Sequence, residues 1–100
     1  MDIEKNNYLI ELFDQYSNLL TKKQVLYLDY YLKYDLSLGE IADNLNVSRS
    51  ACFDLISRSI KKLNDYENKM RLVKNKKKII DSITSSDLNK EVLIKMIEEL

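Results

Sequence analysis

The sequence contains no proline and only one glycine in 100 residues. Proline breaks a helix and glycine weakens it, so a chain almost free of both favours long, uninterrupted helices. No stretch shows the sustained alternation of apolar and polar residues that marks a strand. Hydrophobic residues make up 45% of the chain, which is enough for a folded core. The sequence therefore predicts an all-α fold, as one domain or as one domain with an appendage.

Capping residues and apolar spacing predict a helix-turn-helix bundle of about five helices, with a long central helix and a C-terminal helix. Apolar residues at steps of three and four predict a first helix over residues 5–18, and Thr21 is a suitable N-cap for a second helix near 22–34. Ser37, with a glutamate three residues later, predicts a capping box and a short third helix. Ser48 caps the fourth helix, which has no clear stop for about 30 residues.

The C-terminal part of the chain is predicted to differ from the rest. A basic stretch at 74–78 follows the long helix, serines and a threonine over 82–86 mark a boundary, and Asp87 lies near the start of a terminal helix. The apolar face of that helix comprises Val92, Leu93, Met96, Ile97 and Leu100. We expect a helix-turn-helix domain over 1–72, then a basic linker and a C-terminal helix over 73–100. This helix packs either on the domain or on a partner subunit.

Several residue types that carry chemistry are missing. The chain has no histidine, which excludes a Ser-His-Asp triad and any histidine-ligated metal. The single cysteine forms no intramolecular disulfide and suits a reducing compartment, and the single glycine, Gly39, builds no phosphate-binding loop. No apolar run approaches the roughly 20 residues that span a bilayer. We therefore expect a cytoplasmic protein that is not an enzyme, has no cofactor, no metal site and no membrane partner.

Charge is distributed unevenly, although 16 basic and 16 acidic residues cancel overall. Residues 1–36 hold 4 basic and 6 acidic side chains, residues 37–78 hold 10 and 5, and residues 79–100 hold 2 and 5. The middle segment is thus positive by five charges and its neighbours are negative. This pattern indicates that the middle segment would bind a polyanion. Solvated lysines along a long helix give the same pattern.

Residues 37–63 carry the pattern of a helix-turn-helix motif. Two capped helices meet there across a turn of three to four residues. Small Ala42 allows the helices to approach, and Val47 fills the turn. The inward positions are expected to be Ile41, Ala42, Leu45, Val47, Cys52 and Ile56. Plain helical hairpins share the two helices, but the paired start signals and these offsets favour helix-turn-helix.

The outward positions of the second helix are the candidate nucleic-acid-binding residues. Its first turns are expected to contact base edges, through Arg49, Ser50, Phe53, Asp54 and Ser57. Further along, Arg58, Lys61 and Lys62 are placed to contact phosphates. Asp54 repels phosphate, and it either accepts from a cytosine amine or pairs with Arg58 one turn later. Phe53 is equally suited to a thymine methyl, an unpaired RNA base or another subunit.

The same residues carry a family resemblance. Residues 21–24, 37–42 and 47–50 resemble region 4 of bacterial sigma factors. The YlxM-like family of helix-turn-helix proteins is the closer match over about residues 7–70. Its pattern is similar to the residues at 19–24, the tyrosine pair at 30–31, SLGEIA at 37–42, the stretch at 47–54 and the acidic-aromatic end at 65–67.

This resemblance implies a bacterial regulatory protein of the signal recognition particle pathway. Its partner is then nucleic acid, either DNA or the particle RNA. The alternative is a protein-interaction adaptor of the particle, in which Phe53 and the tyrosine-rich helix contact a particle protein. The family often has a glycine near the end of the long helix, where this chain has Met70, Arg71 and Leu72. Apolar surface beyond the core favours a homodimer, which also suits paired half-sites.

Overall fold

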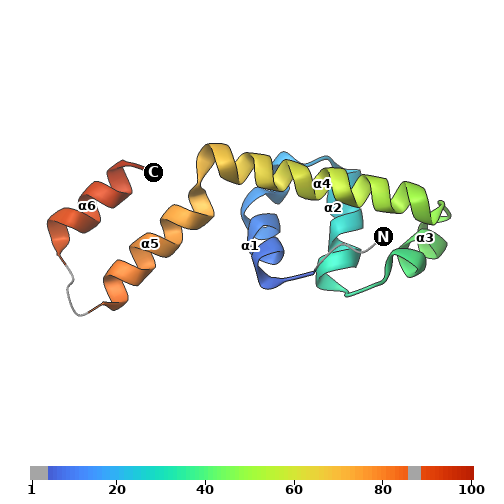
Figure 1. Ribbon diagram of the computed structural model, residues 1–100, viewed down its shortest axis with the longest axis horizontal. Coiled ribbons are helices and arrows are strands. Elements are labelled where there is room, and N and C mark those ends of the chain that lie inside the picture. The colour runs from blue at the N-terminus through green and yellow to red at the C-terminus, as the bar shows by residue number, and fades with distance from the viewer. Residues whose placement is uncertain (1–4, 86–88) are drawn as a thin grey trace. The chain divides into compact units, whose positions relative to one another are not determined.

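The computed structural model describes residues 5–85 and 89–100, and every regular element among them is a helix (Figure 1). This confirms the predicted all-α fold. The chain forms two compact units, which divide between Asp65 and Tyr66. We call them the helix-turn-helix unit and the C-terminal unit.

The helix-turn-helix unit is built from short helices that lie along one side of the first part of a long one (Figure 1). Their bounds are α1 (Asn7–Tyr16), the 3-10 turn η1 (Ser17–Leu19), α2 (Lys22–Leu28), the π-helical turn η2 (Asp29–Lys33), α3 (Leu38–Leu45) and α4 (Arg49–Met70).

Side-chain caps start these helices at the positions that the sequence predicts. The Thr21 hydroxyl accepts a hydrogen bond from the Gln24 amide at 3.2 Å, and the Gln24 side chain accepts from the Thr21 amide at 2.9 Å. Ser37 and Glu40 form the same reciprocal box, with both distances at 3.1 Å. Each box satisfies two backbone donors that a helix start leaves free.

The second helix differs from its prediction in the last turn. It is α-helical only from Lys22 to Leu28 and continues as the wider turn η2, in which the Tyr34 amide donates to the Asp29 carbonyl. Tyr31 and Leu32, which are adjacent in sequence, are both buried in this turn. Adjacent side chains of an α-helix point about 100° apart, and the sequence-based prediction assumed that regular geometry. Apolar spacing alone therefore does not predict a π-helical turn.

The core of the helix-turn-helix unit gathers one apolar face from each helix. Its buried apolar side chains are Leu9, Leu12, Phe13, Tyr16, Tyr27, Leu28, Tyr31, Leu32, Leu38, Ile41, Ala42, Cys52, Ile56 and Leu63. Three of the tyrosines are thus core residues, whereas Tyr34 is exposed.

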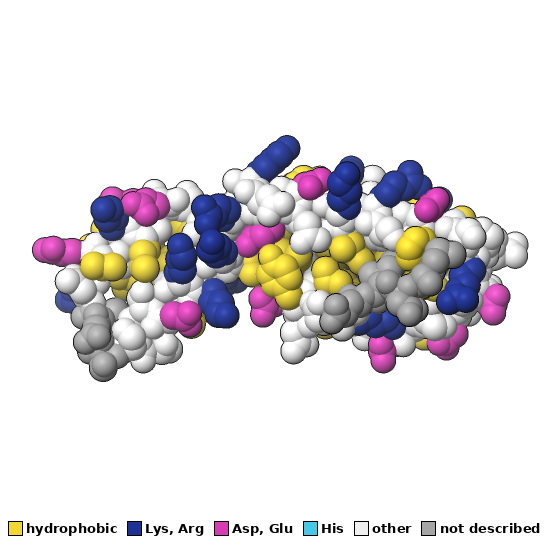
Figure 2. Space-filling view, viewed as in Figure 1, with side chains coloured by type: hydrophobic (Ala, Val, Ile, Leu, Met, Phe, Trp, Pro, Cys, Tyr) yellow, Lys and Arg dark blue, Asp and Glu magenta, His cyan; other side chains and the backbone are white. Residues whose placement is uncertain are grey.

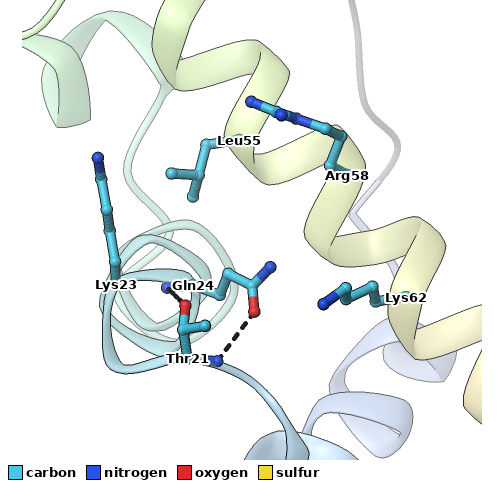
Figure 3. Close-up of a pocket in the computed structure, with 6 residues that line it drawn as sticks. All are labelled: Thr21, Lys23, Gln24, Leu55, Arg58 and Lys62. Atoms are coloured by element: carbon cyan, nitrogen blue, oxygen red, sulfur yellow. Dashed lines mark hydrogen bonds between the residues drawn. The ribbon is translucent and has the colours of Figure 1, made fainter.

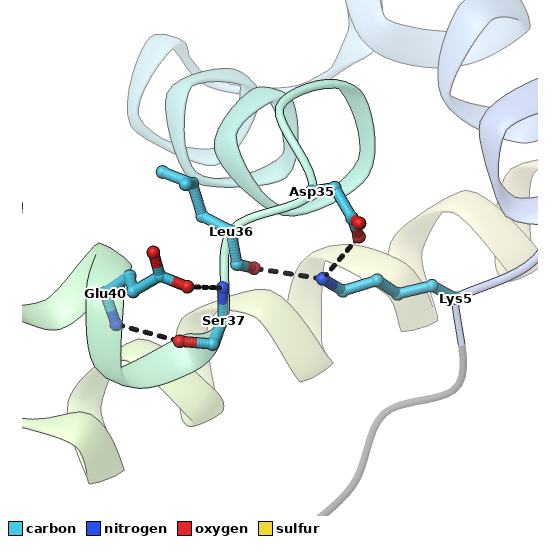
Figure 4. Close-up of polar contacts among 5 residues, drawn as sticks. All are labelled: Lys5, Asp35, Leu36, Ser37 and Glu40. Atoms are coloured by element: carbon cyan, nitrogen blue, oxygen red, sulfur yellow. Dashed lines mark hydrogen bonds and ion pairs between the residues drawn. The ribbon is translucent and has the colours of Figure 1, made fainter.

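A lysine near the N-terminus closes the loop between η2 and α3 (Figure 4). The Lys5 ammonium lies 3.0 Å from the Asp35 carboxylate and 3.0 Å from the Leu36 carbonyl, and 4.4 Å from the centre of the Tyr31 ring. Asp35 has a left-handed backbone, with φ 53°. An ion pair and a cation–π contact therefore hold this strained turn in place.

The long helix is shorter than predicted. Its 22 residues end at Met70, and Arg71 adopts a left-handed conformation with φ 55° and ψ 29°. Arg71 lies within the stretch 70–72, for which the resemblance implies a glycine, the residue that enters this conformation without a steric penalty. The break turns one predicted helix into two, so the described chain has six α-helices rather than about five.

The stretch expected to be a basic linker is helical. Residues Leu72–Thr84 form α5, and Arg71 gives it no side-chain cap. Instead the buried Glu67 carboxylate accepts from the Val73 amide at 3.1 Å and from the Lys74 amide at 3.0 Å. A carboxylate from the preceding helix therefore satisfies the start of α5 and favours a helix over a linker.

The last helix is α6 (Lys90–Glu98), capped by the Asn89 side chain, which accepts from the Glu91 amide at 2.9 Å. Asp87, the predicted start signal, lies outside the described residues. Helices α5 and α6 run in opposite directions as a hairpin, within which the Ser82 hydroxyl lies 3.3 Å from the Met96 sulfur (Figure 1). Among the described helices, none is both long and apolar enough to cross a membrane.

Candidate nucleic-acid interface

The bend between α3 and α4 has the predicted helix-turn-helix form. Asn46 ends α3 in the left-handed conformation, with φ 55° and ψ 47°, and the Val47 amide donates to the Ala42 carbonyl at 3.0 Å. The Ser48 hydroxyl then accepts from the Ala51 amide at 3.0 Å and starts α4. Asparagine tolerates this conformation better than most residues. The turn is therefore fixed by local chemistry at both ends.

One face of α4 is anchored in the core. Cys52, Ile56 and Leu63 are fully buried, and burial raises the pKa of the Cys52 thiol. Ser59 is also fully buried, and its hydroxyl donates to the Leu55 carbonyl at 2.7 Å. A buried thiol with a raised pKa stays protonated at neutral pH, which makes Cys52 a packing residue rather than a nucleophile.

The opposite face carries all eight predicted site residues. Arg49, Ser50, Asp54, Arg58, Lys61 and Lys62 are exposed, and Phe53 and Ser57 are half-buried. They occur as neighbouring pairs repeated every four residues, so they follow one side of the helix over about four turns. This side carries four cations and a single carboxylate.

The single carboxylate is not neutralised by its neighbour. Arg58 donates from Nε to the backbone carbonyl of Asp54 at 3.4 Å, rather than to the carboxylate. The ion pairs among the described residues are Lys5 with Asp35 and Lys33 with Asp14, and neither involves this face. Asp54 therefore presents an exposed negative charge in the middle of a positive helix face.

A pocket adjoins the basic end of this face (Figure 3). Its volume is about 340 Å³. The lining comes from the start of α2 and from α4, and comprises Thr21, Lys23, Gln24, Leu55, Arg58 and Lys62. Leu55 points into the space between the two helices, and the Lys62 side chain extends toward Gln24 (Figure 3). Three of the six lining residues are cationic and none is acidic.

Sequence reasoning missed the α2 side of this pocket. From the sequence, Lys23 and Gln24 were part only of the family resemblance at residues 21–24. The Thr21–Gln24 capping bonds fix the start of α2, and the fold places Lys23 in the lining of the same pocket as Arg58 and Lys62, which follow it by more than thirty residues. Local spacing holds no signal for such a long-range cluster. The one sequence signal for a basic surface at this place is charge, because residues 15–28 contain no acidic side chain.

Metal chemistry finds no support in the described residues, which contain no group of three or more potential ligands from cysteine, aspartate and glutamate. Glu98 and Glu99 are adjacent on a helix, where neighbouring side chains do not face each other. The outward face of α4 therefore offers cations, hydroxyls, one carboxylate and one aromatic ring.

Comparison with known proteins places this arrangement in a family. A family model described as "Putative helix-turn-helix protein, YlxM / p13 like" matches residues 3–100. A UPF0122 protein of Lactococcus lactis is 37% identical over 103 residues, covering 100% of this chain and 93% of the relative. A UPF0122 protein of Fusobacterium nucleatum is 44% identical over 94 residues, covering 92% of this chain and 91% of the relative.

A third relative, from Limosilactobacillus reuteri, is 53% identical over 72 residues, which are 72% of this chain and 64% of that protein. The family match extends through the C-terminal unit, beyond the part of the chain in which the sequence motifs lie. The matched residues, the capped bend and the exposed α4 face lead to one conclusion: this chain belongs to the YlxM/p13-like family of helix-turn-helix proteins.

Proposed function

We propose that the chain is a regulatory protein that binds nucleic acid through the outward face of α4. The observation that carries this proposal is that all eight side chains expected to contact nucleic acid lie on one accessible face, directly after a capped helix-turn-helix bend. In such motifs the first turns of the second helix enter the major groove and contact base edges. Arg49, Ser50, Phe53, Asp54 and Ser57 occupy these turns.

The basic end of the face supplies the phosphate contacts. Arg58 and Lys62 line the pocket together with Lys23, and Lys61 lies beside them on α4. A phosphate held between α2 and α4 would fix the position of the duplex without reading its sequence. Lys23 thus joins Arg58, Lys61 and Lys62 as a proposed phosphate-binding residue.

Salt dependence of binding tests this proposal. Anisotropy titrations with a random-sequence duplex and with a single-stranded RNA of equal length, at several salt concentrations, give the slope of log affinity against log salt. Each lost phosphate contact reduces the slope on duplex DNA by about 0.9. Lys61→Ala and Lys23→Ala are expected to reduce it by that amount. Lys33→Ala, which removes a cation paired with Asp14 away from this face, is the matched control.

Two results would reject nucleic-acid binding through the outward face of α4. The first is an affinity that does not change with salt. The second is an equal slope for the wild type, Lys61→Ala and the control Lys33→Ala. Arg49→Ala then separates base contact from phosphate contact, since it should weaken binding to one sequence more than to random duplex.

A second candidate function is that of a protein adaptor in the signal recognition particle pathway. The exposed, unneutralised Asp54 carboxylate beside half-buried Phe53 favours it, because this pair suits a protein surface better than a phosphate. Retention of the chain on particle RNA, on particle protein and on random duplex at one salt concentration distinguishes the two functions. Retention on random duplex equal to or better than on the particle components rejects the adaptor.

A homodimer also belongs to this proposal. Two copies related by a two-fold axis present two α4 faces, as required for paired half-sites on a duplex.

A further inference from the structure

Between residues 49 and 62, helix α4 carries one carboxylate, that of Asp54. Asp54 is exposed in the second turn of the helix, six residues after the Ser48 cap. Arg49 precedes it by five residues, and Arg58 and Lys61 follow it within about two turns. Figure 2 shows Lys and Arg side chains over α4 with acidic side chains among them. A polyanion that binds this face therefore meets a carboxylate as well as cations.

The fold of the described chain makes no use of this carboxylate. Arg58, one turn later, donates from Nε to the backbone carbonyl of Asp54 at 3.4 Å, and the Arg58 side chain lines the pocket between α2 and α4. The ion pairs among the described residues involve other carboxylates. The N-cap of α4 is Ser48, so Asp54 does not start the helix either. The Asp54 side chain is therefore available to a ligand.

The chemistry of a carboxylate restricts what Asp54 can contact on a nucleic acid. An ionised carboxylate only accepts hydrogen bonds, so its partner has to be a donor. In the major groove guanine presents two acceptors, and thymine presents one acceptor and a methyl group. Adenine presents a donor beside an acceptor, whereas cytosine presents its N4 amine alone. Cytosine is therefore the base whose edge best suits the Asp54 carboxylate.

We propose that Asp54 selects a cytosine in the major groove of B-form DNA as the ligand of the α4 face. This inference rests on the proposed function and names the nucleic acid that it concerns. The major groove of B-form DNA admits a helix, whereas that of A-form RNA is too deep and narrow for side chains to read. Cations on either side of Asp54 attract the backbone phosphates, and the carboxylate accepts a hydrogen bond from the cytosine amine between them.

Asp54 acts on specificity largely by rejection. Over guanine or thymine the carboxylate meets another acceptor, and both groups lose their hydrogen bonds to water without gaining a donor. The same charge repels phosphate, so it weakens binding at every register that lacks a cytosine beneath it. Removal of the carboxylate should therefore raise the affinity for random duplex and lower the discrimination between sequences. A residue with a purely structural role would not change these two quantities in opposite directions.

Selection from a library of random DNA duplexes, with the full-length chain, tests this inference. The wild type should enrich a cytosine at one position of its site. Asp54→Asn should enrich adenine at that same position, because an asparagine amide pairs with the N6 and N7 atoms of adenine. Asp54→Ala should lose the cytosine preference there and keep the preferences at the other positions.

Anisotropy titrations then measure the discrimination on two duplexes, the selected one and one with guanine in place of that cytosine. The wild type should bind the selected duplex about five- to a hundredfold more tightly. In Asp54→Ala this ratio should fall toward one, while the affinity for random duplex rises. Circular dichroism checks that the variants keep their helicity.

Asp65→Asn is the matched control, since Asp65 is exposed on nearly the same side of α4 about three turns later. It removes the same charge beyond the turns that are proposed to contact bases. This variant should also raise the affinity for random duplex, but its selected sequence should equal that of the wild type. Charge repulsion and base selection are thus measured separately.

Three results overturn this inference. The first is a wild type that enriches no cytosine, the second is the same enriched base in Asp54→Asn as in the wild type, and the third is tighter binding to single-stranded RNA than to the selected duplex. Salt-dependent duplex binding with unaltered sequence preference in the Asp54 variants leaves the proposed function standing and rejects the role of Asp54 alone. Duplex binding that does not change with salt rejects both.

Discussion

The two units use similar apolar spacing with opposite results. In the helix-turn-helix unit, four helices direct their apolar faces to a shared centre and bury side chains such as Leu12 and Ile56 completely. In the C-terminal unit, α5 and α6 have the same three/four rhythm and bury no apolar side chain in their described parts. Periodicity reveals which face of a helix seeks burial, but the number of neighbouring helices decides whether burial is achieved.

The two units also end their helices differently. The bend after α3 uses an asparagine in the left-handed conformation and a serine cap, both of which are local signals. At the bend after α4, Arg71 adopts that conformation, and the Glu67 carboxylate accepts a hydrogen bond from the Val73 amide at the start of α5. Local chemistry therefore makes the first bend predictable from sequence, whereas the second depends on a contact between two helices.

The difference in burial between the two units is tested by the same substitution, isoleucine to alanine, made once in each unit. Ile56→Ala removes a fully buried side chain and should cost about 2–5 kcal/mol of unfolding free energy. Ile83→Ala removes a half-exposed one and should cost less than about 1 kcal/mol in dilute solution. Urea unfolding at a concentration where the chain is monomeric measures both. Equal losses would mean that Ile83 belongs to a packed core in a single copy.

The second-largest loss of stability is expected at the bend after α4. Glu67→Ala leaves the Val73 and Lys74 amides without their carboxylate acceptor, and lost hydrogen bonds to a charged group cost about 1.5–3 kcal/mol. Hydrogen exchange should therefore become faster at these two amides, with little change in the core of the helix-turn-helix unit. Glu98→Ala, at an exposed carboxylate of α6, is the control. A uniform change in exchange over both units would reject this local role.

The left-handed residues at the two bends, Asn46 and Arg71, offer a smaller and opposite test. A left-handed backbone costs a residue with a side chain about 1–2 kcal/mol, and glycine escapes that penalty at some cost in unfolded-state entropy. Arg71→Gly should therefore stabilise the start of α5 by about 0.5–1 kcal/mol. Asn46→Gly should change stability less, since asparagine already tolerates this conformation. Slower exchange of α5 amides in Arg71→Gly checks the effect, and faster exchange would contradict it.

The helix-turn-helix unit was largely predictable because its signals are local. Thr21, Ser37 and Ser48 are N-caps whose partners lie three residues away, and the inward and outward positions of α4 follow from helical period. The orientation of Cys52 and Ile56 inward, with Arg49 and Asp54 outward, is confirmed for this reason. Half-buried Phe53 lies at the edge of the two faces.

The remaining features depend on contacts that spacing does not encode. The left-handed Arg71 follows from the Glu67 carboxylate meeting the start of α5, and the sequence around Arg71 contains no glycine or proline to mark it. Likewise, Lys23 joins Arg58 and Lys62 only after the core has brought α2 beside α4. Exposed cations attract any anionic surface. Their positions in the sequence therefore do not distinguish DNA, RNA and protein as the ligand, and binding experiments have to do so.

The smallest expected effect on the unfolding free energy comes from Cys52, in the core of the helix-turn-helix unit, and it depends on pH. Burial raises the pKa of the Cys52 thiol above its ordinary value of 9.0, so the folded state resists ionisation more than the unfolded chain does. Stability from the neutral thiol is fully present below pH 9 and is lost as the pH rises through and beyond that value. At neutral pH the expected effect is therefore zero.

Urea unfolding of the wild type and of Cys52→Ala, repeated from neutral to alkaline pH, isolates this contribution. Tyrosines and lysines titrate in both proteins, so the difference between the two pH profiles belongs to the thiol. The wild type should lose stability faster above pH 9, by at most about 1.4 kcal/mol for each pH unit. Parallel profiles would mean that the thiol ionises as easily in the folded unit as in the unfolded chain, contrary to the burial of Cys52 on the inward face of α4.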